Sequence, residues 1–203
     1  MVVLLPRIFC LVSSVDDLNL LPAFAERGIG GFQVRDKAAT TRELLALTAS
    51  VIERVEAYDA CVVVDDRLDV ALAAGAHGVH LGASDLPVAE ARRIADAVAP
   101  GLVIGATCRD RAAVEAAAAA GADYAGFGPV FVTASKAGLP DPLGVSAVAE
   151  AAGALPLIAI GGISASSAAE VRAAGAHGVA VIGGLWRPPD PLQAAKELVE
   201  AVG

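Results

Sequence analysis

One short unit occurs four times along this chain: the end of an alanine- and glycine-rich helix, a turn of small residues and a brief apolar strand. Repeated helix-to-strand connections predict that helices and strands alternate, which is the pattern of a parallel sheet covered by helices. In a barrel built from such units, the residues just past each strand form the active site. The four copies are AERGIGGFQV (25–34), AAGAHGVHLG (73–82), AAGADYAGFG (119–128) and AAGAHGVAVIG (173–183).

Eight short apolar runs are predicted to be strands, and helical segments lie between them. The runs are apolar throughout instead of alternating with polar residues, which is typical of strands buried on both faces. Eight βα units in 203 residues predict an α/β protein, a single-domain (β/α)8 TIM barrel over residues 1–203. A doubly wound open sheet is the alternative, because the number of strands does not by itself show closure, although GxGxxG is absent after the first strand. The predicted strands are 7–12, 31–35, 61–64, 78–80, 103–106, 124–127, 157–160 and 178–182.

Composition narrows the class of protein further. Hydrophobic residues make up 56% of the chain, but every apolar run ends well before the ~20 residues that a membrane-spanning helix needs. The N-terminal MVVLLPRIFCLVSS has no basic start and is interrupted by Arg7, so a buried strand is predicted there instead of a signal peptide. The net charge of −8 argues against a nucleic-acid or membrane partner, so a bound anion must be held by local groups. Cys10, Cys61 and Cys108 are too scattered for a disulfide framework or a zinc site, and a cytoplasmic location is expected.

Polar residues follow the second predicted strand in an alternating pattern. Gln33, Arg35 and Lys37 point the same way if the strand continues through them, which would direct two cations and an amide at one place. A salt-bridged rim of the barrel would explain the same three residues.

Carboxylates follow the third and fourth predicted strands. Asp65 and Asp66 come after one strand and Asp85 after the next. Carboxylates at adjacent strand ends suit a hard cation such as Mg²⁺, which takes one or two carboxylates together with phosphate oxygens. The alternative is that they cap the helices that follow.

The later strands lead into glycine-rich segments. The connection 126–144 is long and dense in glycine and proline, and it carries Thr133, Ser135 and Lys136 as a candidate phosphate grip, unless it is an ordinary solvated loop. Glycine pairs at 161–162 and 183–184 allow backbone N–H groups to approach an anion, as in the usual phosphate site of this fold, although tight turns also use glycine.

The three histidines do not form a recognisable catalytic arrangement. His77 and His177 share one place in the GAHGV repeat, in the turn before a strand, so they are expected on the face opposite the active site. His80 lies within a strand, either in the core or in the pocket.

Taken together, these segments resemble one known family. GFGPVFVTASK, AIGGI and GVAVIGG, with QVRDK and DDRLDVALAAGAHGVHLGASDLP upstream, are similar to the thiamine phosphate synthases and their relatives, the thiazole tautomerases. The synthases are (β/α)8 barrels that join hydroxymethylpyrimidine pyrophosphate to a thiazole phosphate and release pyrophosphate. The resemblance implies Mg²⁺ as cofactor, two phosphorylated small molecules as substrates and a place in thiamine biosynthesis, and it leaves room for a homodimer.

The resemblance also implies roles for individual residues. Asp66 and Asp85 match the Mg²⁺ ligands, and Lys136, Arg35 and Thr107 match residues expected to act in catalysis, with Lys136 on the leaving pyrophosphate. Departure of the pyrophosphate leaves a cation that the pyrimidine ring stabilises, so charge stabilisation is sufficient and no protein nucleophile is needed. The substrate-binding residues that the resemblance implies are Gln33, Arg35, Lys37, Asp65, Thr107, Thr133, Ser135, Lys136, Gly162, Ile182 and Gly183.

Several positions depart from the family pattern. Asp65 stands where the synthases have Asn, Arg109 where the family has the histidine proposed for proton transfer in the tautomerases, Val132 where proline is usual and Gly183 where serine is expected. The missing histidine argues against tautomerase chemistry, and the retained cations favour the synthase. A thiazole phosphate tautomerase and a catalytically silent protein that binds a phosphorylated ligand are the alternatives.

Overall fold

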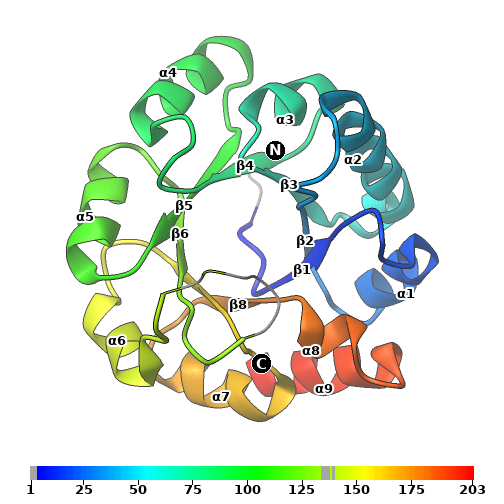
Figure 1. Cartoon of the computed structure of the whole chain (residues 1–203), viewed down its shortest axis with the longest axis vertical. Helices are drawn as coiled ribbons and strands as arrows, with labels where there is room; N and C mark the ends of the chain where they lie inside the picture. Colours follow the sequence, from blue (N-terminus) through cyan, green and yellow to red (C-terminus); the bar gives the residue numbers. More distant parts are fainter. Residues whose placement is uncertain (1–3, 134–137, 139) are drawn as a thin grey trace.

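The computed structural model describes residues 4–133, 138 and 140–203 and shows a closed barrel of eight parallel strands in sequential order (Figure 1). Strand β8 pairs with β1, through Ile8 with Val179 and Cys10 with Val181, so the sheet has no edge. This closure confirms the (β/α)8 barrel and rules out the open sheet. The strands are β1 (Ile8–Val12), β2 (Gly31–Val34), β3 (Cys61–Asp65), β4 (Gly78–Leu81), β5 (Val103–Cys108), β6 (Tyr124–Phe127), β7 (Leu157–Ile160) and β8 (Gly178–Val181).

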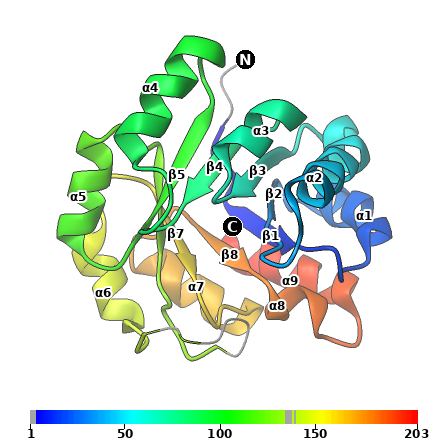
Figure 2. The same cartoon turned by 45° about the horizontal axis from the view of Figure 1, so that its top comes forward.

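Helices form a ring outside the strands, as Figures 1 and 2 show. Three of them begin at capping residues that are visible in the sequence: Thr40 and Glu43 form a reciprocal capping box at α2, and Asp110 and Asp190 accept hydrogen bonds from the first turns of α5 and α9. The helices are α1 (Leu21–Glu26), α2 (Thr41–Val55), α3 (Leu68–Ala74), α4 (Val88–Val98), α5 (Arg111–Ala119), α6 (Gly144–Ala151), α7 (Ala165–Ala173), α8 (Gly183–Trp186) and α9 (Pro191–Val202), with the 3-10 turns η1 (Leu18–Leu20) and η2 (Glu56–Tyr58).

Side chains alternate along each strand between the barrel interior and the helices. In β1, Cys10 packs in the large cluster between strands and helices, whereas Phe9 and Leu11 belong to a second cluster inside the barrel. The segment before β1 lies at the amino-terminal ends of the strands. Its Leu5 packs there against the interior cluster. Apolar side chains therefore fill the barrel at the amino-terminal ends of its strands in the part of the chain that the structure describes.

The structure corrects several predicted boundaries. Strands β3, β4 and β5 continue to Asp65, Leu81 and Cys108, because their backbone ladders extend beyond the apolar runs. Strand β2 ends at Val34, one residue before the prediction, and the short helix α8 was not predicted.

The two histidines of the GAHGV repeats lie at the amino-terminal end of the barrel, as predicted. His77 Nδ1 accepts a hydrogen bond of 3.0 Å from the backbone N–H of Val62, and His177 Nε2 lies 3.0 Å from the carbonyl oxygen of Leu5. Both are structural. In the part of the chain that the structure describes, no helix has the length and apolar character needed to cross a bilayer.

Gly105 gives a direct test of packing inside the barrel. A Cβ atom there would lie 2.1 Å from Cζ of Tyr124 and 2.5 Å from Nδ1 of His80. We expect Gly105→Ala to lower the free energy of unfolding by roughly 1–3 kcal/mol or more, because the overpacked rings must move. Urea denaturation measures this change. Gly30→Ala is the matched control, because its Cβ would meet only Pro6, at 3.6 Å; equal stability of the two variants would contradict the packing.

Candidate active site

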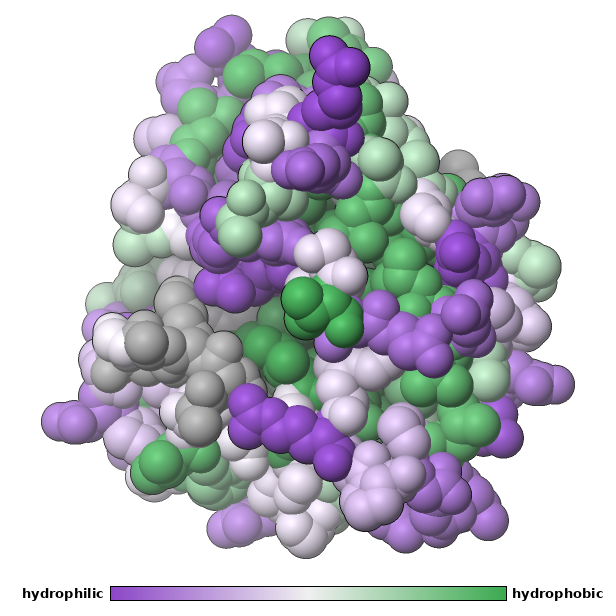
Figure 3. Space-filling view, turned by 45° about the vertical axis from the view of Figure 1, so that its right-hand side comes forward, coloured by the Kyte–Doolittle hydropathy of each residue, from purple (hydrophilic) through white to green (hydrophobic). Residues whose placement is uncertain are grey.

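A cavity of about 630 Å³ opens at the carboxyl ends of the strands. In Figure 3 this face of the molecule is hollowed near its centre, and hydrophilic side chains stand around the hollow. Every predicted site residue that the structure describes lines the cavity, whereas Ser135 and Lys136 lie outside the described residues. The lining residues predicted from the sequence are Gln33, Arg35, Lys37, Asp65, Asp66, Asp85, Thr107, Thr133, Gly162, Ile182 and Gly183.

Asp65 is the centre of a buried polar cluster between β2 and β3. Its Oδ1 accepts a hydrogen bond of 2.7 Å from Gln33 Nε2, and its Oδ2 lies 2.9 Å from Arg35 Nε. Burial, and secondly repulsion from Asp66, raise the pKa of Asp65 to about 6, against the opposing effects of Arg35 and Gln33. The salt-bridged rim and the shared orientation predicted for Gln33 and Arg35 are therefore both present.

A second acidic group lies at the ends of β3 and β4. Asp66 adopts a left-handed backbone conformation, with φ of 65°, and its backbone N–H donates to the His80 carbonyl oxygen at 2.7 Å. Its carboxylate accepts a hydrogen bond from Lys37 and interacts with the carboxyl group of Asp85. Aspartate tolerates the left-handed region better than most residues, and such conformations are concentrated at functional sites.

The two carboxyl groups of this pair differ in their proton affinity. Burial raises the pKa of Asp66, but hydrogen bonds to Lys37 and Asp85 and nearby positive charges together bring it below its ordinary value. Burial and the hydrogen bond to Asp66 raise the pKa of Asp85. The pair therefore favours a bound proton or cation between its members, because two adjacent carboxylates repel each other.

The structure does not support the alternative that these aspartates cap helices. Helix α3 has Arg67 at its N-cap and α4 has Pro87, and neither cap makes a side-chain hydrogen bond. Asp85 Oδ2 instead accepts from the backbone N–H of Gly82 at 2.7 Å, within its own loop. The carboxylates of Asp66 and Asp85 therefore line the cavity and do not cap helices.

His80 lies on the floor of the cavity, not in the core between sheet and helices. Its Nδ1 is 3.1 Å from the hydroxyl of Tyr124, and its Nε2 is 3.0 Å from Oγ1 of Thr107. Burial lowers the pKa of His80 to about 4, so the ring is neutral at physiological pH. Thr107 connects this buried pair to the open cavity.

Glycine backbone and the cation Arg187 contribute to the opposite side of the cavity. Gly161 and Gly162 have φ values of 95° and 68°, which few other residues adopt, and they bring the backbone after β7 to the cavity. Gly183 lines the same side, and a Cβ there would lie 3.1 Å from Nε of Arg187. The glycine, where the family pattern has serine, therefore leaves room for a guanidinium group.

Arg109 occupies the position of the family histidine. Its guanidinium donates to the carbonyl oxygens of Gly128, at 3.2 Å, and Asp141, at 3.0 Å, and so joins the end of β5 to the segment after β6. An arginine in this position has only N–H donors, which here bind backbone carbonyl oxygens, and it has no acceptor atom with which to replace the histidine in proton transfer.

Tyr124 and Arg187 also line the cavity, although the sequence patterns did not place them there. Tyr124 shares the inward face of β6 with Gly126, which the alternation of strand side chains could have revealed. Arg187 follows α8, which the sequence patterns did not predict, so no local signal placed it.

Comparison with known proteins agrees with this geometry. A sequence model of the family described as thiamine monophosphate synthase matches residues 6–185. The chain belongs to this family. It is 48% identical to the thiamine-phosphate synthase of Methanoculleus marisnigri over 180 residues, which are 88% of this chain and 84% of that protein.

Two further relatives show how much of the chain is similar to thiamine monophosphate synthase family members. The thiamine biosynthesis bifunctional protein ThiM/ThiE of Symbiobacterium thermophilum is 46% identical over 198 residues, and this chain spans 96% of its own length but 40% of that protein. The solved thiamine phosphate pyrophosphorylase of Pyrococcus furiosus has a TM-score of 0.85 and 33% identity, with 97% of this chain and 95% of that chain covered.

The raised pKa of Asp65 predicts a pH-dependent stability. The folded protein holds the proton of the Asp65 carboxyl group more tightly than the unfolded chain does. The contribution of this proton to the free energy of unfolding is therefore complete below about pH 4 and is lost as the pH rises through about 6. Asp65→Asn cannot titrate, so its free energy of unfolding relative to the parent should rise by up to about 3 kcal/mol from pH 4 to pH 7.5. Urea denaturation across this range measures the difference, and a difference independent of pH would contradict the prediction.

Proposed function

We propose that this protein is a thiamine phosphate synthase: a transferase that joins hydroxymethylpyrimidine pyrophosphate to a thiazole phosphate and releases pyrophosphate. The observation that carries the proposal is the convergence of Arg35 and Lys37 with Asp66 and Asp85 at neighbouring strand ends of one cavity. The family membership, and a likeness to proteins named thiamine-phosphate synthase over most of the chain, support it.

The cation-bearing side of the cavity suits a pyrophosphate. Arg35 and Lys37 bring two positive charges from the end of β2, which offset the charge of a leaving pyrophosphate in a chain whose overall charge is −8. Arg109 lines the same cavity beyond β5. Lys136 lies outside the described residues, and its contact with pyrophosphate stays a prediction from the family resemblance.

Asp66 and Asp85 fit a magnesium ion. By themselves, the two carboxylates would repel a pyrophosphate. A pyrophosphate can therefore bind beside them only if a cation lies between the carboxylate oxygens and the phosphate oxygens. Among residues 4–133, 138 and 140–203, no group of three or more His, Cys, Asp or Glu side chains could hold a metal. Two carboxylates completed by phosphate oxygens and water match the usual coordination of Mg²⁺. When bound, Mg²⁺ would neutralise part of the charge on the departing pyrophosphate.

The glycine side of the cavity suits the second substrate. The backbone of Gly161, Gly162 and Gly183 and the side chain of Thr133 lie across the cavity from the acidic pair and can surround a single phosphate. A thiazole held there can direct its ring nitrogen at the pyrimidine methylene carbon. The C–O bond breaks first and the pyrophosphate leaves with its electron pair; the thiazole nitrogen then donates its lone pair to the methylene carbon of the pyrimidine cation to form the new C–N bond.

The described part of the cavity gives no support to the tautomerase alternative. Arg109, in place of the family histidine, is engaged with two carbonyl oxygens and cannot act as a base. A silent binding protein is distinguished from the synthase by turnover alone. We also propose a cytoplasmic location, which the three free, buried cysteines support.

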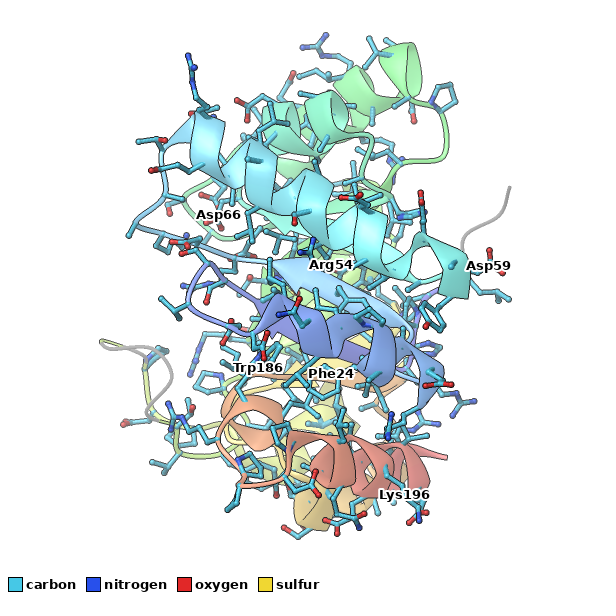
Figure 4. The ribbon with its side chains drawn as sticks, turned by 90° about the vertical axis from the view of Figure 1, so that its right-hand side faces the viewer. Phe24, Arg54, Asp59, Asp66, Trp186 and Lys196 are labelled. Atoms are coloured by element: carbon cyan, nitrogen blue, oxygen red, sulfur yellow. The ribbon has the colours of Figure 1, made fainter. Side chains whose placement is uncertain are left out.

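Substitution of Asp66 has a matched control in Asp59. Asp66 and Asp59 both have positive φ, 65° and 52°, and Figure 4 shows them at opposite ends of the barrel. We expect Asp66→Asn to lower kcat/KM by about 100-fold or more, because it removes a charge that the metal and pyrophosphate require, and Asp59→Asn to leave it unchanged. Coupled detection of pyrophosphate with both substrates measures this; equal effects of the two substitutions would contradict the assignment.

Removal of the metal tests the cofactor. Turnover of the two substrates should disappear in excess chelator and return when MgCl₂ is added, because the acidic pair and the pyrophosphate then share a cation. Full activity in chelator would overturn the magnesium proposal. No thiamine phosphate from both substrates with Mg²⁺ present would overturn the synthase itself.

A further inference from the structure

A hydrogen-bonded chain of three side chains connects the buried floor of the barrel to the cavity. Tyr124 is 1% exposed and His80 is 8% exposed, and His80 stands between the hydroxyls of Tyr124 and Thr107, at 3.1 and 3.0 Å. Thr107 is itself exposed to the cavity. A polar group at the cavity surface is therefore linked to a phenol that is almost fully buried.

The packing holds the two rings of this chain in place. A Cβ at Gly105 would overlap both rings, and a Cβ at Gly126 would lie 2.6 Å from Cε1 of His80, so both rings occupy space that the glycines leave. Phe9 stacks on Tyr124 with ring centroids 5.8 Å apart. The geometry of the hydrogen bonds is thus fixed by the barrel interior and does not depend on a ligand.

The proton positions in this chain follow from counting donors and acceptors. A neutral imidazole has one N–H and one lone pair, so one neighbouring hydroxyl donates to it and the other accepts from it. Among the residues that the structure describes, His80 is the sole hydrogen-bond partner of the Tyr124 hydroxyl. If Nδ1 carried the proton, the phenolic O–H would be buried with no acceptor, which is costly.

The Tyr124 hydroxyl must therefore donate to Nδ1 of His80. The ring proton is then on Nε2, which donates to Oγ1 of Thr107. One lone pair of the threonine oxygen is used by this bond, so its own O–H is left to point into the cavity as a donor.

We propose that Tyr124 and His80 are positioning residues that fix the Thr107 hydroxyl as a hydrogen-bond donor to an acceptor atom of the pyrimidine substrate. The identity of that substrate rests on the proposed function, whereas the tautomer of His80 does not. Thr107 then selects for a lone pair at that place on the ligand, such as that of a ring nitrogen, and selects against an N–H group.

The tautomer is measured on the ligand-free protein by ¹⁵N NMR of the imidazole nitrogens. His77→Gln and His177→Gln, which change the histidines at the other end of the barrel, assign the His80 signals. We expect a protonated Nε2 and an unprotonated Nδ1 that loses its hydrogen-bonded shift in Tyr124→Phe. A protonated Nδ1 in the parent protein would overturn the proposal whether or not the protein is a synthase.

Steady-state kinetics tests the consequence for binding. Tyr124→Phe should raise KM for the pyrimidine substrate by about three- to tenfold and leave KM for the thiazole substrate unchanged, because one hydrogen bond loses its fixed direction. Thr107→Val should raise the KM for the pyrimidine substrate at least as much, whereas Thr107→Ser, which keeps the hydroxyl, should have the KM of the parent protein.

The chain offers a matched control for the phenol. Tyr58, 42% exposed and outside the cavity, is the only other tyrosine, so Tyr58→Phe should change neither KM. Folding of each variant is checked by its thermal unfolding midpoint. An unchanged pyrimidine KM in Tyr124→Phe, or equal changes for both substrates, would overturn the positioning role.

Discussion

The alternation of side chains along eight hydrogen-bonded strands is the constraint on which the rest of this structure depends. Every second residue faces the helices and is apolar, which provides the main core. The intervening residues face the barrel axis; at the carboxyl ends, β2 to β5 present the polar residues Gln33, Asp65, His80 and Thr107 to the cavity, whereas β1, β7 and β8 present the apolar residues Leu11, Ile160 and Ala180. One periodicity therefore supplies both the stability of the barrel and the chemistry of its open end, and a shift of one residue in any strand would exchange the two.

The polar residues at the open end compensate one another before any ligand binds. Asp65 is engaged by Gln33 and Arg35, and Asp66 by Lys37 and Asp85. A phosphorylated substrate must replace some of these contacts with its own, so binding exchanges one set of ion pairs for another and does not simply add charge to an empty cavity.

Much of the fold and part of the site could be predicted from local sequence. Apolar runs and the GAHGV repeat located the strands, and alternation placed Gln33, Arg35 and Lys37 on one side. The spacing of Asp66 and Asp85 could not distinguish a metal site from helix caps, because both use an acid just after a strand; the observed caps, Arg67 and Pro87, exclude only the second of these. The contacts of His80 with Tyr124, 44 residues away, depend on which ring fills which gap inside the barrel, and no local pattern encodes that.

The absence of a side chain at Gly105 and Gly126 also limits how the barrel floor can change in evolution. Each glycine is required by a ring that another strand contributes, and each ring has its place only because the glycines are there. A side chain added at Gly105 meets both rings, one added at Gly126 meets His80, and loss of either ring leaves a void, so steps that change these sizes one at a time pass through a less stable protein. The four positions should therefore be inherited together across descendants of this sequence, as one unit of variation and not as four independent sites.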